Sequence, residues 1–139
     1  PLEAADREDT AWLEALVWPE QAARRQRLRQ ALALTAGLRP RLVAGDAAET
    51  FAQVAAALPP EGPVVVFHAF ALVQFPAAAK ARLLAALDAL AARRTVWRVS
   101  YEHMAGAFAE LRLQRHGAEQ DARLLAEAAP HGDWLRWHA

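Results

Sequence analysis

A continuous run of β-branched and aromatic residues occupies positions 64–68, without any alternation of apolar and polar side chains. Runs of this kind are typical of strands covered on both faces, as in parallel sheets that lie between helices. Two other segments, 41–44 and 95–100, also have the composition of short strands. The pattern therefore predicts a parallel sheet of three strands with 64–68 at its centre.

Helical periodicity fills the chain before and between these strands. Apolar residues within 12–17 recur along one helix face, Asp6 is a suitable N-cap, and Pro19 ends that helix and suits the start of the next. Gly37 is a plausible stop for the second helix. The four predicted helices cover about residues 6–18, 19–37, 48–58 and 76–94. The order β-α-β-α-β that results is typical of an α/β fold.

The C-terminal part has a different pattern. Residues 108–116 alternate between apolar and polar positions, which is typical of a half-exposed strand. A turn over 130–133 then leads to a short apolar segment, 134–137. Short segments joined by tight turns predict an antiparallel extension of the sheet. We expect one α/β domain over residues 1–139, with two N-terminal helices, parallel core strands and this extension.

Composition excludes several classes of function. The 139 residues carry 16 basic and 16 acidic side chains, so we expect neither a nucleic acid nor a membrane surface as partner. The absence of cysteine excludes disulfides, thiolate nucleophiles and Cys-ligated metals. No apolar run reaches the length of a membrane span and no secretory signal opens the chain, so a cytoplasmic location is expected. The start at Pro1 suggests a fragment of a longer protein.

Candidate functional residues lie at the carboxyl ends of the predicted strands, where open α/β sheets bind ligands. Asp46, His68, Ser100 and Glu102 all fall there. An imidazole beside carboxylates could transfer protons or bind a ligand amine, which makes His68, Ser100 and Glu102 the candidate catalytic residues. The sequence leaves a structural role open as an alternative, in which His68 hydrogen-bonds a neighbouring loop.

Other kinds of site receive less support. A hydrolase triad of Ser100, His68 and Asp46 lacks the Gly-x-Ser-x-Gly turn that would expose the serine. The five histidines are scattered without His-x-x-x-His spacing, so no metal site is predicted. Neither Gly-x-Gly-x-x-Gly nor a Walker motif is present, so the chain has no phosphate-binding loop for a nucleotide.

Four motifs occur in an order that resembles a known family. They are Leu-Val-Trp-Pro-Glu-Gln at 16–21, Gly-Asp at 45–46, the run at 64–68, and His-Gly-Asp-Trp-Leu-Arg-Trp at 131–137. In these the chain resembles the C-terminal part of a bacterial family, domain of unknown function 2332. The resemblance implies a Rossmann-like, partial doubly wound sheet of the kind found in S-adenosylmethionine-dependent methyltransferases. It also implies that Asp46 lies in the turn facing the adenine of the cofactor, and that the end of strand 64–68 meets the substrate.

The chain departs from the full methyltransferase-like fold, because the first two strands and their cofactor loop are not in it. It implies a methyltransferase-like protein whose C-terminal part is inactive alone. We therefore expect this chain to bind no cofactor, and a full-length protein to bind S-adenosylmethionine. The alternatives are a non-catalytic interaction or scaffolding domain and, third, a small hydrolase. The free edge of strand 64–68 predicts pairing with a second copy or with the missing N-terminal half, unless strand 41–44 closes onto it.

Overall fold

The computed structural model describes residues 3–38, 40–103, 108–117 and 121–138. Contacts within the chain divide it into two compact units, Pro1–Leu42 and Val43–Ala139. We call them the helical unit and the sheet unit, and each is described by itself.

The helical unit contains the two predicted N-terminal helices, α1 (Arg7–Ala15) and α2 (Ala22–Leu38). Asp6 caps α1 as predicted, since its carboxylate accepts hydrogen bonds from the first-turn amides at 2.7 and 3.1 Å. An ion pair of 2.7 Å between Arg29 and Glu14 joins the two helices. None of the helices in the described ranges has both the length and the apolar character needed to cross a bilayer.

Two predicted boundaries of α2 are wrong. The helix starts at Ala22 instead of Pro19, because residues 18–21 form a turn closed by the hydrogen bond from Gln21 N to Trp18 O, 3.0 Å. It also continues through Gly37, which does not end the helix. Glycine is tolerated inside a helix at a cost of about 1 kcal/mol relative to alanine.

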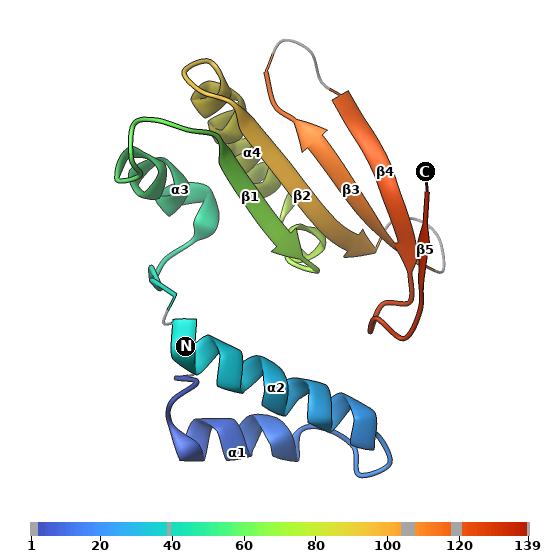
Figure 1. Ribbon diagram of the computed structural model, residues 1–139. Coiled ribbons are helices and arrows are strands. Elements are labelled where there is room, and N and C mark those ends of the chain that lie inside the picture. Colours follow the sequence, from blue (N-terminus) through green and yellow to red (C-terminus); the bar gives the residue numbers. More distant parts are fainter. Residues whose placement is uncertain (1–2, 39, 104–107, 118–120, 139) are drawn as a thin grey trace. The chain divides into compact units, whose positions relative to one another are not determined.

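The sheet unit follows the predicted order of elements from residue 47 onward. Its elements are α3 (Ala47–Ala56), β1 (Val64–Ala69), the 3-10 turn η1 (Leu72–Gln74), α4 (Ala77–Ala91), β2 (Val96–His103), β3 (Ala109–Arg115), β4 (Asp121–Ala128) and β5 (Leu135–Trp137). The strands pair in the linear order β1-β2-β3-β4-β5 (Figure 1). The β1–β2 pair is parallel and the other three are antiparallel, so the predicted antiparallel extension is confirmed.

The predicted strand at 41–44 is absent. These residues form neither helix nor strand, and Leu42 and Val43 are exposed. A strand gains its stability from a partner that accepts and donates the ladder hydrogen bonds, and no described strand pairs with this run. The parallel part of the sheet is therefore one β-α-β unit and not the three-stranded core expected from the pattern.

The prediction that β1 is covered on both faces is also wrong. Val64 is buried against Leu87 of α4 and Val96 of β2, and Phe51 of α3 packs on the same cluster. The alternate residues of β1 point to the opposite face, where Val65 remains 60% exposed and Phe67 64% exposed. We call this the open face of the sheet. Helices α3 and α4 both pack on the other face, so the valine run reflects strand propensity and not burial on two sides.

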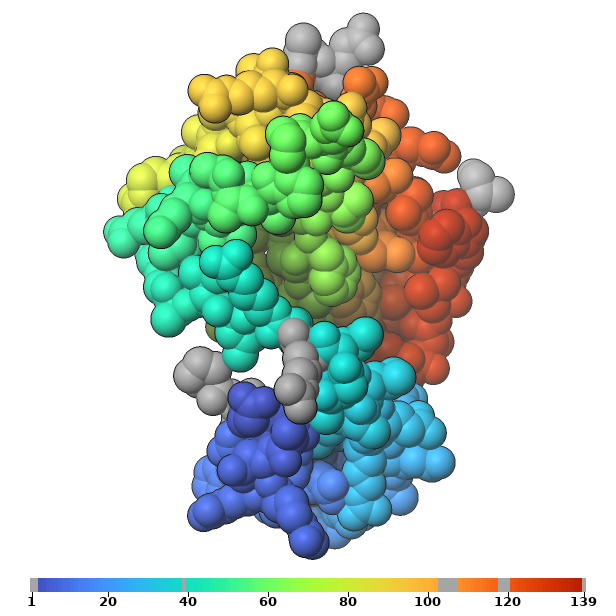
Figure 2. All heavy atoms as spheres, turned by 60° about the vertical axis from the view of Figure 1, so that its left-hand side comes forward, coloured from blue at the N-terminus to red at the C-terminus, as the bar shows by residue number. Residues whose placement is uncertain are grey.

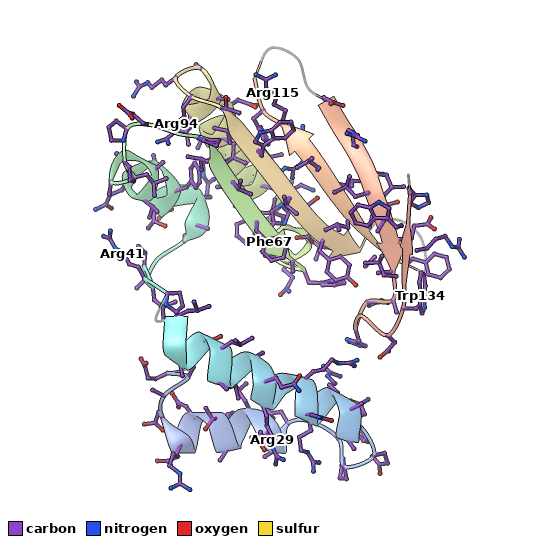
Figure 3. The ribbon with its side chains drawn as sticks, in the orientation of Figure 1. Arg29, Arg41, Phe67, Arg94, Arg115 and Trp134 are labelled. Atoms are coloured by element: carbon purple, nitrogen blue, oxygen red, sulfur yellow. The ribbon has the colours of Figure 1, made fainter. Side chains whose placement is uncertain are left out.

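Arg94, just beyond α4, fixes the loop that leads into β1. Its guanidinium donates hydrogen bonds to the carbonyl oxygens of Pro59, Glu61 and Gly62 at 2.7, 2.8 and 3.0 Å. Figure 3 shows Arg94 beside this loop, between the end of α3 and the start of β1. The arginine therefore sets where the parallel strand begins.

Candidate functional site

His68 and Glu102 form a hydrogen-bonded pair at the carboxyl ends of the two parallel strands. His68 on β1 is in register with Ser100 on β2, and Glu102 lies two residues further along the same face. The distance between His68 Nδ1 and Glu102 Oε1 is 2.6 Å. The two side chains are only 10% and 8% exposed. The pair thus lies beneath the surface at the edge where open α/β sheets bind ligands.

The Glu102 carboxylate also accepts three backbone hydrogen bonds from the turn after β1. The amides of Ala71 and Leu72 donate to Oε1 at 3.0 Å each, and that of Val73 donates to Oε2 at 3.1 Å. These amides converge because Phe70 adopts a left-handed conformation, φ 49°, which is uncommon for a residue with a side chain. The turn is held in place by the edge-to-face contact of the Phe70 and Tyr101 rings, 5.3 Å between centroids.

These contacts keep Glu102 ionised. Burial alone raises the pKa of its carboxyl group, but the hydrogen bonds from His68 and from the three amides outweigh burial and hold the pKa below its usual value. An ionised carboxylate only accepts hydrogen bonds, so His68 must donate its Nδ1–H to it. The Nε2 atom of His68 then carries the ring's free lone pair.

This Nε2 atom is buried and has no hydrogen-bond partner among the described residues. A histidine oriented by a carboxylate at one nitrogen and free at the other can accept a proton. Ser100 is buried beside it, but no hydrogen bond joins Ser100 to Nε2, so the geometry of a serine–histidine pair is not formed. The structure therefore brings His68, Ser100 and Glu102 together, with Glu102 as the partner of the imidazole.

Asp46, the fourth candidate, is in another place. It caps α3, where its carboxylate accepts a hydrogen bond of 2.7 Å from the amide of Ala48. It lines a hollow of about 430 Å³ together with Gly45, Ala47, Gln74, Phe75, Pro76 and Ala79. The segment that follows β1 thus reaches both places: its amides bind Glu102, and its last residues line the hollow with Asp46.

The described residues do not by themselves fit S-adenosylmethionine. The carboxylate expected to face adenine is already bound to a helix N-terminus, and no strand precedes it. The chain also lacks the glycine-rich loop that allows a cofactor to approach the backbone. Within the described ranges, no group of three or more metal-ligating side chains gathers either.

A second histidine–carboxylate pair lies between α4 and the sheet. His116 Nδ1 is 2.7 Å from Asp88 Oδ1, and the His116 side chain is 3% exposed. Arg98, which is half-buried, bonds Gln114; burial lowers the pKa of its guanidinium, although the nearby carboxylates of Glu102 and Asp88 act in the opposite direction. Sequence reasoning missed this pair, because 28 residues separate its members and only the packing of α4 brings them together.

Three glutamates stand side by side across the sheet. Glu102, Glu110 and Glu127 are in register on β2, β3 and β4. Like charges directly opposite one another destabilise a sheet unless each is compensated. Glu110 has Arg112 at 2.6 Å and Glu127 has Arg136 at 3.3 Å, whereas Glu102 has His68 and the three amides. Glu127 also has His138 at 3.6 Å. Each glutamate therefore has its own partners, and the row is not one shared site.

One comparison with known families gives a match. A family model described as "Uncharacterized protein conserved in bacteria (DUF2332)" matches residues 1–137. No curated protein and no solved structure matches the chain.

Proposed function

The chain belongs to the DUF2332 family of bacterial proteins. From the resemblance described above, we propose that it supplies the substrate side of a Rossmann-like, S-adenosylmethionine-dependent methyltransferase-like protein. The main observation that supports this proposal is the hydrogen bond of 2.6 Å between His68 and Glu102 at the carboxyl ends of the parallel strands. In this proposal His68 accepts the proton that the substrate loses, and the chain by itself is inactive.

Proton acceptance is the chemistry that this pair supports best. A nitrogen or oxygen nucleophile loses a proton when it gains a methyl group, so the reaction benefits from a nearby base. A positioned histidine typically contributes about 10²–10⁴-fold to such a step. Glu102 fixes the ring, directs Nδ1–H toward itself, and leaves Nε2 as the basic atom.

The proposal assigns the methyl donor to residues outside this chain. S-adenosylmethionine needs a close backbone approach that the described residues do not offer. What this chain supplies is the proton acceptor, the hydroxyl of Ser100 beside it, and the hollow near Asp46.

Calorimetric titration tests the assignment of the donor. S-adenosylmethionine and S-adenosylhomocysteine are each titrated into this chain and into a longer version that carries the preceding residues of the natural protein. We expect binding by the longer protein and none by the chain alone. Binding by neither protein, or by the chain alone, would overturn the proposal.

The state of the His68 ring gives an independent prediction. At neutral pH, ¹⁵N NMR of histidine-labelled protein should show His68 protonated at Nδ1 and bare at Nε2, because the ionised Glu102 requires the Nδ1 proton. The Glu102→Gln variant should lose this tautomer preference. A wild-type spectrum with the proton on Nε2 would contradict a role for that atom as base.

A non-catalytic interaction domain is the second candidate function. The observation that favours it is the open face of the sheet, where Val65, Phe67, Leu135 and Trp137 are all exposed apolar side chains. Exposed apolar side chains on both edge strands of one sheet face favour contact with another protein. The same titration separates the two functions, since an interaction domain predicts no donor binding by either protein.

A further inference from the structure

The turn after β4 lies at the same edge of the sheet as the candidate site. β1 and β2 run parallel, and because β3 is antiparallel to both of its neighbours, β4 runs in the same direction as β2. The carboxyl ends of β1, β2 and β4 therefore share one edge, as Figure 1 shows. We call residues 129–134 the C-terminal turn. It is closed by hydrogen bonds from Ala129 N to Trp134 O, 3.1 Å, and from Gly132 N to Ala129 O, 2.8 Å.

Tyr101 of β2 contacts both the C-terminal turn and the turn after β1. Its hydroxyl donates a hydrogen bond of 2.6 Å to the carbonyl oxygen of Ala129. Burial raises the pKa of this hydroxyl, so it stays protonated and able to donate. The ring of Tyr101 meets the ring of Phe70 edge to face, at an angle of 88°. In addition, the backbone N–H of Phe70 donates to the carbonyl oxygen of Tyr101 at 2.8 Å. Tyr101 thus joins the two turns.

The backbone conformation of Phe70 determines where the amides of the turn after β1 point. Its φ of 49° is unfavourable for a residue with a side chain, and such a conformation persists only where the surroundings hold it. Deep burial does not hold the whole turn, since Val73 is 52% exposed and Figure 2 shows the green segment that contains β1 reaching the surface. Gln74 Nε2 donates to Phe70 O at 2.6 Å, which holds the backbone. The contact with the Tyr101 ring holds the side chain.

We propose that Tyr101 is a positioning residue for His68, acting through Phe70 and Glu102. The Tyr101 ring, fixed at its outer end by Ala129, holds Phe70 in the left-handed conformation. The three amides that follow then converge on Glu102, and the carboxylate so fixed holds the Nδ1–H of His68. Without these amides, Glu102 loses three of its four described hydrogen bonds and its hold on the imidazole weakens. The use of His68 as a base rests on the proposed function, whereas the contacts that orient its ring do not.

The tautomer of His68 is the readout that tests this role, and ¹⁵N NMR of histidine-labelled protein measures it. We expect Tyr101→Leu to lose the preference for Nδ1–H and to show a mixture of the two tautomers. Tyr101→Phe keeps the ring and its contact with Phe70, so it should keep the wild-type tautomer. Trp97→Leu is the matched control, since Trp97 is a half-buried aromatic residue on the same face of β2 and pairs with Val65. Its loss should leave the His68 tautomer unchanged.

Substitutions of Phe70 separate positioning from general destabilisation. Phe70→Leu removes the same ring contact from the other side, so it should change the His68 tautomer as Tyr101→Leu does. Glycine adopts a positive φ without a steric cost, so Phe70→Gly should keep the turn without the Tyr101 ring. In that background, Tyr101→Leu should no longer affect His68.

Three results would overturn the proposal. They are a wild-type tautomer in Tyr101→Leu or Phe70→Leu, an equal change in Trp97→Leu, and an undiminished effect of Tyr101→Leu in the Phe70→Gly background. The NMR measurement needs neither a methyl donor nor a substrate. Its result is therefore independent of the calorimetric titration, and failure of the positioning role is distinguishable from failure of the proposed function.

Discussion

Replacing Glu102 with glutamine should lower the free energy of unfolding by about 3 kcal/mol, because it removes a buried charge that satisfies four donors. The amide of glutamine has one oxygen to accept with, and its NH₂ group can only donate. At least one of the buried amides after β1 therefore loses its acceptor. Urea unfolding followed by circular dichroism measures the effect.

The control for this variant is Glu110→Gln. Glu110 is the register partner of Glu102 on β3, but it is half-buried and its described ion pair is with Arg112 alone. Pairs of that kind contribute about 0–1 kcal/mol, so this variant should unfold close to the wild type. Equal destabilisation by the two substitutions would show that the amides of the turn do not depend on Glu102.

The same comparison has a defined pH dependence. The pKa of Glu102 is lower in the folded chain than in the unfolded one, so protonation of this group favours unfolding. Its contribution to stability is complete above the unfolded pKa of about 4.3 and is lost as the pH falls through the folded pKa. The difference in stability between wild type and Glu102→Gln should therefore shrink below about pH 4. A difference that stays constant to lower pH would contradict the lowered pKa.

Truncation of Leu87 to alanine should destabilise the sheet unit by about 2–5 kcal/mol. Leu87 is fully buried, and it joins α4 to the parallel strands through Val64 and Val96. Its loss leaves a cavity in the middle of the cluster that fixes β1 against β2. Leu58→Ala, at a leucine that is 39% exposed, is the control and should cost under about 1 kcal/mol. Thermal unfolding of both variants under one set of conditions checks the expectation.

Local patterns predicted the elements of the sheet unit but not their pairing. The helical period gave α4, and strand composition gave β1 and β2, because both signals lie within the segment itself. Whether a segment becomes a strand also depends on a partner that is distant in the sequence. Residues 41–44 have strand composition, but none of the strands that the structure describes pairs with them. The exposed Val65 shows that a valine run does not establish burial on both faces.

The candidate site was predictable only as far as strand ends are predictable. His68, Ser100 and Glu102 come together because two parallel strands in register end at the same edge of the sheet. The three amides that bind Glu102 depend on the left-handed conformation of Phe70. No sequence pattern predicts this conformation at a phenylalanine. Asp46 has a local structural role, as the cap of a helix that begins one residue later.

The linear strand order also has a kinetic consequence. Each antiparallel pair of the sheet joins strands that follow one another in the chain, whereas β1 reaches β2 only after the whole of α4. Contacts between segments close in sequence require less loop-closure entropy and form faster. The hairpins of β2 to β5 should therefore fold first and act as the template onto which β1 docks. Because His68 lies on β1 and Glu102 on β2, the hydrogen bond between them forms only in this last step.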